Sequence, residues 1–162
     1  MQVVLEVGPL ANSHSTAGQF LQVKVGDSKP GFFAIASAPS SDKQYVELLV
    51  RSQPGSTAEL ICQAAVGSDV MASSVMGKGF NVDSIPPETC PHVLLFATGS
   101  GISPIKAVIE SGVLQPHKRK SIKLYYGTQD RAWTAYEDLI PKWQSMGVEV
   151  RQVGQSVSRG GG

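Results

Sequence analysis

An apolar run that ends in a Gly-x-Gly turn constrains this chain more than any other feature. The run covers residues 94–97 and continues into Thr98-Gly99-Ser100-Gly101-Ile102-Ser103-Pro104. Such a run predicts a strand covered on both faces, as in a parallel sheet. The glycines let a ligand approach the main chain, and Pro104 suits the first position of a helix, whose free N–H groups favour a phosphate. We interpret the segment as a phosphate-binding turn, although an unliganded turn between strand and helix has the same pattern.

The residues after this turn predict an α/β unit. Expected in order are a helix over 104–112, a strand over 122–126, a capped helix after Thr134 that Pro141 kinks or delays, and a strand over 148–153. This order predicts a parallel sheet with right-handed crossovers. Ligands of such sheets lie at the carboxyl ends of the strands, here residues 99–103 and 127–130.

The first half of the chain predicts a different architecture. Short strand-like segments lie at 3–7, 20–25, 32–35, 45–50 and 69–73, separated by turn-forming residues. This spacing predicts an antiparallel β-barrel. One helix is expected within it, because Ser56-Thr57-Ala58-Glu59 has capping-box spacing after Pro54-Gly55. Its start is either a second anion site or an ordinary capped helix end, and the two readings are equally supported.

Both halves together resemble the ferredoxin-NADP reductase-like flavoproteins. The shared motifs, in family order, are Gly18-Gln19-Phe20, Phe33-Ala34-Ile35-Ala36-Ser37, Gly55-Ser56-Thr57, Met76-Gly77-Lys78-Gly79-Phe80, the turn at 97–104 and Tyr126-Gly127. Within the family, the chain is most similar to the plant and bacterial branch that includes the kiwifruit ripening-related oxidoreductase-like proteins. Six motifs in the right order are much more specific than one glycine pattern.

The resemblance implies two domains with one cofactor each. Residues 1–88 would be an FAD-binding β-barrel and residues 89–162 an α/β domain that binds NADPH or NADH. The implied FAD-binding residues are Phe33, Ala34, Ile35, Ala36, Ser37, Gly55, Ser56 and Thr57. The implied nicotinamide-dinucleotide residues are Thr98, Gly99, Ser100, Gly101, Ile102, Pro104, Tyr126 and Gly127. No side chain is expected to act as a catalytic acid or base, because the cofactors carry the chemistry.

The chain departs from the family in two respects. The family's Arg-x-Tyr-Ser motif is here Gly31-Phe32-Phe33-Ala34, which lacks the arginine for the flavin phosphates and the hydroxyl that faces the flavin. Compared with the family, we also expect the first barrel strand and the last two strands of the parallel sheet to be missing. The strand at 94–98 would then be left as an unpaired edge.

The predicted function is that of an FAD-dependent NAD(P)H oxidoreductase that passes electrons to an unidentified acceptor, for which a small redox protein is a candidate. One alternative is a catalytically silent flavin-binding or interaction module produced by truncation, and another is a small NAD(P)-binding domain without flavin. The net charge of +1 argues against nucleic-acid binding. No run is apolar enough to span a membrane. The dispersed histidines are expected at the surface or in loops, and neither they nor the two cysteines predict a metal site. The basic run at 118–120 is interpreted as a solvated turn. We expect a soluble intracellular protein, cytoplasmic or, in a photosynthetic eukaryote, plastidic.

Overall fold

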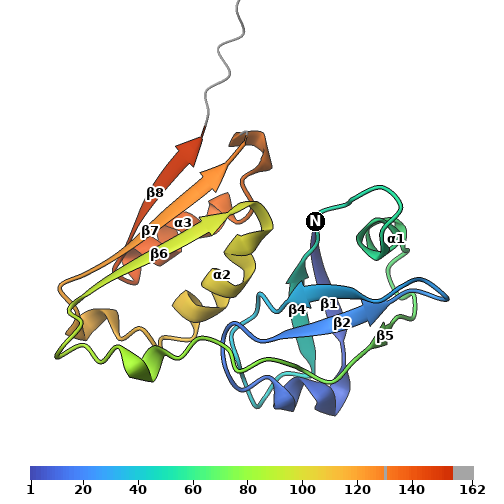
Figure 1. Ribbon diagram of the computed structural model, residues 1–162, viewed down its shortest axis with the longest axis horizontal. Coiled ribbons are helices and arrows are strands. Elements are labelled where there is room, and N and C mark those ends of the chain that lie inside the picture. Colours follow the sequence, from blue (N-terminus) through green and yellow to red (C-terminus); the bar gives the residue numbers. More distant parts are fainter. Residues whose placement is uncertain (130, 155–162) are drawn as a thin grey trace, which may run out of the picture. The chain divides into compact units, whose positions relative to one another are not determined.

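The computed structural model describes residues 1–129 and 131–154 and divides into two compact units (Figure 1). The first unit consists of Met1–Asn81 and Ser103–Ser111, and the second of Val82–Ile102 and Gly112–Gly162. Asp130, at the end of one predicted ligand-binding edge, lies outside the described residues. None of the described helices is long and apolar enough to cross a bilayer.

The first unit is built from antiparallel strands. Strand β1 (Gln2–Glu6) pairs with β4 (Tyr45–Leu49), and β2 (Phe20–Lys24) lies between β3 (Gly31–Ala34) and β5 (Met71–Ala72). A bridge between Ile35 and Leu48 links the two sheets. Alternate residues of the strands point into one apolar core, which holds Ala11, Leu21, Val23, Ile35, Val46, Leu48, Val50 and Ile61.

The predicted capping box is present at the start of helix α1 (Thr57–Gln63). The Glu59 N–H donates to Ser56 Oγ at 3.3 Å, and the Gly55 N–H donates to Glu59 Oε2 at 2.8 Å. Because the two side chains satisfy main-chain donors reciprocally, the sequence pattern alone is sufficient to start this short helix.

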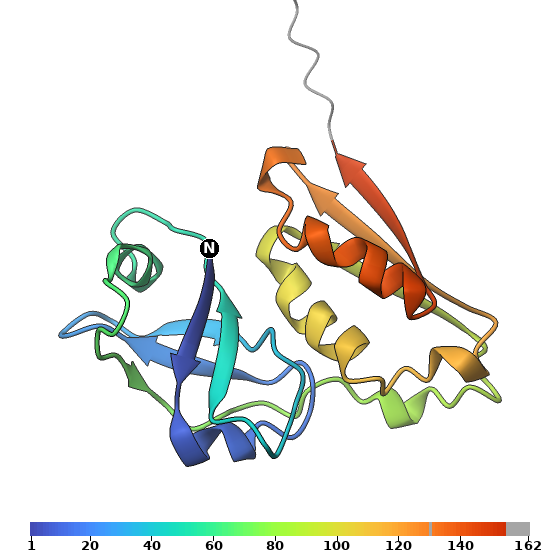
Figure 2. The ribbon, with the colours of Figure 1, turned by 180° about the vertical axis from the view of Figure 1, so that it is seen from behind.

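The second unit contains a parallel sheet in the order β6-β7-β8. Its strands are β6 (His92–Thr98), β7 (Ser121–Thr128) and β8 (Val148–Gly154). Helix α3 (Ile140–Ser145) lies across one face (Figure 2) and buries Trp143 completely. Pro141 is its second residue, so the late start is confirmed, whereas the capped start expected after Thr134 is wrong. The fold class is also confirmed, since antiparallel strands precede a parallel sheet.

Short 3-10 turns connect these elements. They cover Gly8–Ser13, Val82–Ser84, Gly99–Gly101, Pro116–Lys118, Arg131–Trp133 and Glu137–Leu139. The turn at Gly99–Gly101 leads directly into helix α2 (Ile102–Glu110). Pro104 is therefore the third residue of α2, and the prediction that it opens the helix is wrong by two positions. The fold tolerates this shift because the N–H groups of a first helical turn have no intrahelical acceptor.

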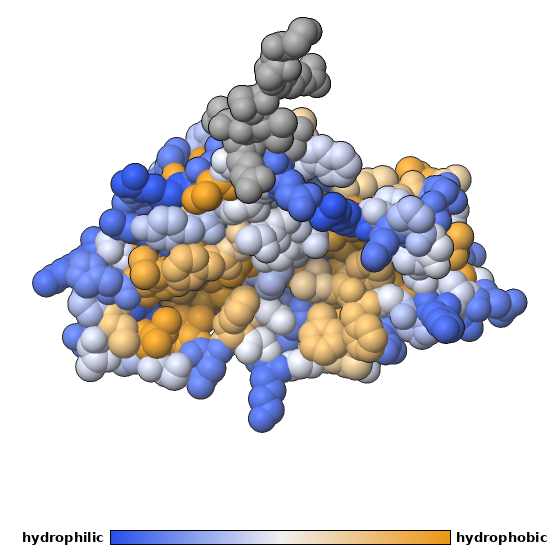
Figure 3. All heavy atoms as spheres, turned by 45° about the horizontal axis from the view of Figure 1, so that its top comes forward, coloured by the Kyte–Doolittle hydropathy of each residue, from blue (hydrophilic) through white to orange (hydrophobic). Residues whose placement is uncertain are grey.

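The prediction that residues 94–97 are covered on both faces is wrong for the described part of the chain. Leu94 is 57% exposed and Phe96 68% exposed, whereas Val93 and Ala97, which flank this segment, are buried. The ring of Phe96 stacks on that of Tyr125 at 5.4 Å between centroids. Figure 3 shows hydrophobic side chains gathered on this open face, opposite the face that carries α3.

Two side chains expected at the surface are buried instead. Arg119, from a basic segment predicted to be solvated, donates to the carbonyl oxygens of Leu114, Cys90 and Ile85 at 2.6, 2.5 and 2.7 Å. His14 is 4% exposed, and its Nε2 has no hydrogen-bond partner among the described residues. Arg119 is buried because a guanidinium can satisfy several carbonyl groups at once, which a charge count along the sequence does not reveal.

Candidate functional site

The turn between β6 and α2 leaves its main chain open. The Ile102 N–H donates to the carbonyl groups of Gly99 and Ser100, which closes the 3-10 turn. Gly99 has a φ of +50°, in the left-handed region, whereas Gly101 does not have a positive φ. A Cβ at either glycine would meet no described atom within 4 Å. Packing within the described chain therefore does not require glycine at position 101, and a ligand can approach the main chain there.

Ser103, the second residue of α2, was not among the predicted ligand residues. Its side chain is 2% exposed, and its Oγ has no hydrogen-bond partner among the described residues. A buried hydroxyl without a partner is costly unless a ligand or water completes its bonding. Ser103 lies next to Pro104, within the motif at 97–104, and this position could have identified it as a candidate ligand residue. An orphaned hydroxyl and an open turn both fit a phosphate-containing ligand.

Tyr126 shapes the same turn from the neighbouring strand. Its hydroxyl accepts a hydrogen bond from the Ala135 N–H at 3.1 Å and lies 3.4 Å from the Gly99 carbonyl oxygen, to which it donates. Burial raises the pKa of Tyr126, and the Ala135 N–H opposes that rise. The phenol therefore keeps the proton with which it holds Gly99 in place. At Gly127 a Cβ would be in ordinary van der Waals contact with Thr98 Cγ2, at 3.4 Å.

The segment from Phe33 to Ser37 is held firmly within the first unit. The Ile35 N–H donates to Gln19 O at 3.1 Å, and the Ala36 N–H donates to Glu47 O at 2.7 Å. Ser37 Oγ accepts from the Glu47 N–H at 3.1 Å. Ile35, Ala36 and Ser37 are all buried. The five predicted flavin residues in this segment, Phe33, Ala34, Ile35, Ala36 and Ser37, therefore form one fixed strip at the end of β3.

The ring of Phe33 lies beside Gly31, where the family has an arginine. A Cβ at Gly31 would lie 2.8 Å from Phe33 Cε2 and 3.5 Å from Thr57 Cβ. The phenyl ring thus fills the space that a side chain at position 31 would need. A side chain at position 31 would therefore meet both the Phe33 ring and Thr57, the first residue of α1.

The start of α1 fits an anion only in part. Gly55 has a φ of +74°, and a Cβ there would meet no described atom within 4 Å. The N–H groups of Thr57 and Ala58 have no intrahelical acceptor, as in any first turn. The Thr57 hydroxyl is already engaged, because it donates to Lys29 O and lies 3.1 Å from Ser28 Oγ. The Glu59 carboxylate also places a negative charge at this helix end.

Comparison with known proteins places this geometry in context. No family model matches the chain. The chain is 35% identical over 142 residues to the fruit protein pKIWI502 of Actinidia deliciosa. That alignment covers 82% of this chain and 44% of the relative, so the chain spans less than half the length of pKIWI502.

Two solved structures show the same fold. A ferredoxin-NADP+ reductase mutant from Plasmodium falciparum superposes with a TM-score of 0.74 at 16% identity, covering 94% of this chain and 62% of that one. A ferredoxin-NADP+ reductase from Neisseria gonorrhoeae, with bound FAD and NADP, gives 0.71 at 16% identity and covers 94% and 61%. The resemblance found in the sequence motifs is thus confirmed.

Proposed function

We propose that this chain, which has the ferredoxin-NADP+ reductase-like fold, is an FAD-containing oxidoreductase that takes electrons from NADPH or NADH. We assign FAD binding to residues 1–88 and nicotinamide binding to residues 89–162. The observation that carries the proposal is the open turn at Gly99–Gly101, followed by the buried, unpartnered hydroxyl of Ser103. When bound, FAD would supply the hydride-accepting ring that no amino-acid side chain can provide.

The first unit would hold FAD at two places. The fixed strip at the end of β3 offers Phe33 for apolar contact and the Ser37 hydroxyl as a polar group. The main chain at Gly55, Ser56 and Thr57 would receive the pyrophosphate through the free N–H groups of the first turn of α1. With glycine at position 31, no arginine from β3 can assist, so the main chain must provide most of this contact.

The turn after β6 would hold the nicotinamide dinucleotide. The predicted contacts are the main chain of Thr98, Gly99, Ser100, Gly101 and Ile102, the first turn of α2 at Pro104, and the strand end at Tyr126 and Gly127. Tyr126 contributes by holding Gly99, because its hydroxyl already bonds within the chain. The Ser103 hydroxyl would gain a hydrogen-bond partner from a bound ligand.

The electron acceptor in this proposal is a small redox protein. The support is the name of the structural relatives, ferredoxin-NADP+ reductase, which pairs a nicotinamide cofactor with a protein carrier. Activity with ferredoxin, compared with activity on free flavin or ferricyanide, tests this choice. Turnover with free flavin but not with ferredoxin would refute it.

FAD titration of the purified chain tests the proposal. We expect saturable binding of one FAD, measured by calorimetry and by a change in the visible absorption of the flavin. A competing titration with FMN separates contacts to the ring from contacts to the pyrophosphate and adenosine. The absence of both heat and spectral change with FAD would contradict the flavoprotein assignment.

A flavin-binding module without turnover is the second candidate. The Glu59 carboxylate and the missing arginine favour it, because both weaken the attraction for a pyrophosphate at α1. In that case FAD would bind but NADPH and NADH would not reduce it. Anaerobic titration of the FAD-loaded protein distinguishes the two functions.

A further inference from the structure

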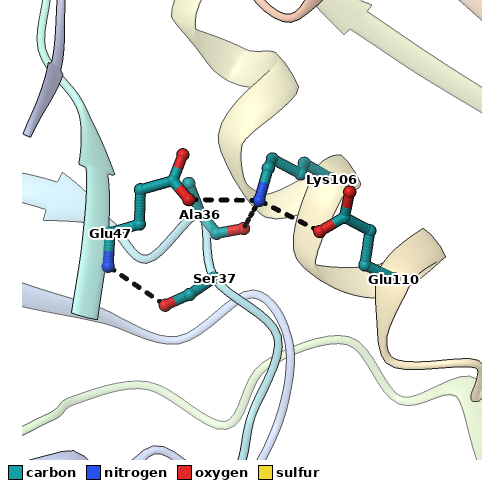
Figure 4. Close-up of polar contacts among 5 residues, drawn as sticks. All are labelled: Ala36, Ser37, Glu47, Lys106 and Glu110. Atoms are coloured by element: carbon teal, nitrogen blue, oxygen red, sulfur yellow. Dashed lines mark hydrogen bonds and ion pairs between the residues drawn. The ribbon is translucent and has the colours of Figure 1, made fainter. Parts of the chain in front are cut away.

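Lys106 is a buried cation that lies outside the predicted ligand contacts. It comes from α2, and its side chain is 7% exposed. Its Nζ lies 3.0 Å from Glu110 Oε2, 3.2 Å from Glu47 Oε2 and 3.4 Å from the carbonyl oxygen of Ala36 (Figure 4). An ammonium group has three N–H donors and no acceptor, so these contacts match its full donor capacity.

The Ala36 contact connects Lys106 to the predicted flavin strip. Ala36 is completely buried, and its N–H is bound to the Glu47 carbonyl oxygen at 2.7 Å. The Glu47 N–H in turn donates to Ser37 Oγ, as Figure 4 shows. Glu47 therefore holds Ala36 and Ser37 from β4, while its own carboxylate is held by Lys106. The ammonium therefore contacts Ala36 directly and reaches both Ala36 and Ser37 through Glu47.

The carboxylates are needed to keep this cation buried. Burying an unpaired ammonium would cost several kcal/mol, and each carboxylate offsets part of that cost. Glu110 lies one helical turn after Lys106 and can pair with it within α2 alone. The contacts to Glu47 and Ala36 cannot form within the helix. These two contacts therefore connect α2 to the strip formed by residues 33–37.

We propose that Lys106 is a positioning residue for the flavin, acting through the Ala36 carbonyl and Glu47 to set the main chain of residues 33–37. This inference rests on the proposed function, because it takes that strip as the flavin contact. Lys106 itself need not touch the flavin. Its effect would be on the affinity and on the environment of the bound ring, since small displacements of a binding strip weaken every contact that the strip makes.

The test compares a double variant that preserves the net charge of the cluster with a single variant that keeps the ammonium. Lys106→Met combined with Glu110→Gln removes the ammonium and one carboxylate, so the cluster keeps its net charge of −1 while Ala36 and Glu47 lose their contacts with the ammonium. Glu110→Gln alone keeps the contacts of the ammonium with Ala36 and Glu47, and it is the matched control. FAD affinity is measured by calorimetry, the ring environment by visible circular dichroism, and the Ala36 N–H by hydrogen exchange in the absence of FAD.

We expect the double variant to bind FAD about tenfold more weakly, with altered circular dichroism and faster exchange at Ala36, and the control to resemble the wild type. Wild-type affinity and spectrum in the double variant would overturn this inference and leave the proposed function intact. Failure of the wild type to bind FAD would overturn both. If the double variant unfolds, Lys106→Arg with Glu110→Gln keeps a cation at position 106, and it must bind FAD with the affinity of the Glu110→Gln control for the inference to hold.

Discussion

Replacing Arg119 by methionine should destabilise the chain more than replacing an exposed basic residue does. The guanidinium donates to the carbonyl oxygens of Ile85, Cys90 and Leu114, which belong to two segments on either side of β6 and α2. Each hydrogen bond from a charged donor contributes about 1.5–3 kcal/mol, and the desolvation of the guanidinium offsets much of the sum. We therefore expect a loss of about 2–4 kcal/mol in the free energy of unfolding.

Urea denaturation followed by circular dichroism measures this loss. At this chain length it corresponds to a fall in Tm of about 5–15 °C. Lys118→Met is the matched control, because it removes the same charge from an exposed neighbour. It should change stability by less than about 0.5 kcal/mol. Equal stability of the Arg119 and Lys118 variants would refute the view that the guanidinium holds these carbonyl groups together.

Three further changes test the candidate sites and the core. Glu59→Gln keeps the capping box but removes a negative charge, so FAD should bind several-fold more tightly at low salt in calorimetry; unchanged affinity would argue against a pyrophosphate at α1. Gly101→Val should leave Tm nearly unchanged yet weaken NADPH binding at least tenfold in a fluorescence titration, because its Cβ would lie in open space; unaltered binding would exclude this turn as a ligand contact. Burial lowers the pKa of His14 below its ordinary 6.5, so the unfolded chain binds the proton more readily and stability should fall as pH drops below 6.5. His14→Gln should flatten that dependence in urea titrations, and an equal slope in both proteins would show that His14 is not the cause.

The order of the elements could be predicted from the sequence because it depends on local patterns. The alternation of apolar residues identified the strands, and the Ser56–Glu59 spacing identified α1. The delayed start of α3 followed from Pro141 in the same way. Each of these features is decided by neighbouring residues, so no knowledge of tertiary contacts was needed.

The errors lie where distant residues decide the outcome. Arg119 is buried because carbonyl groups up to 34 positions away in sequence converge on it. The face of β6 with Leu94 and Phe96 is exposed because α3 lies on the other face of the sheet. For the candidate site, the open glycines could be predicted, but the packing of Phe33 over Gly31 could not. It depends on a side-chain orientation that the motif does not specify.

Reduction of bound flavin by NADPH tests the proposed function most directly. The FAD-loaded chain is mixed with NADPH, and in parallel with NADH, under anaerobic conditions, and the visible absorption band of oxidised flavin is followed over time. The proposed function predicts bleaching of this band with at least one of the two nucleotides, at a rate that saturates with nucleotide concentration and is lost in Gly101→Val. An unchanged band with both nucleotides, in protein shown to hold FAD, would contradict it.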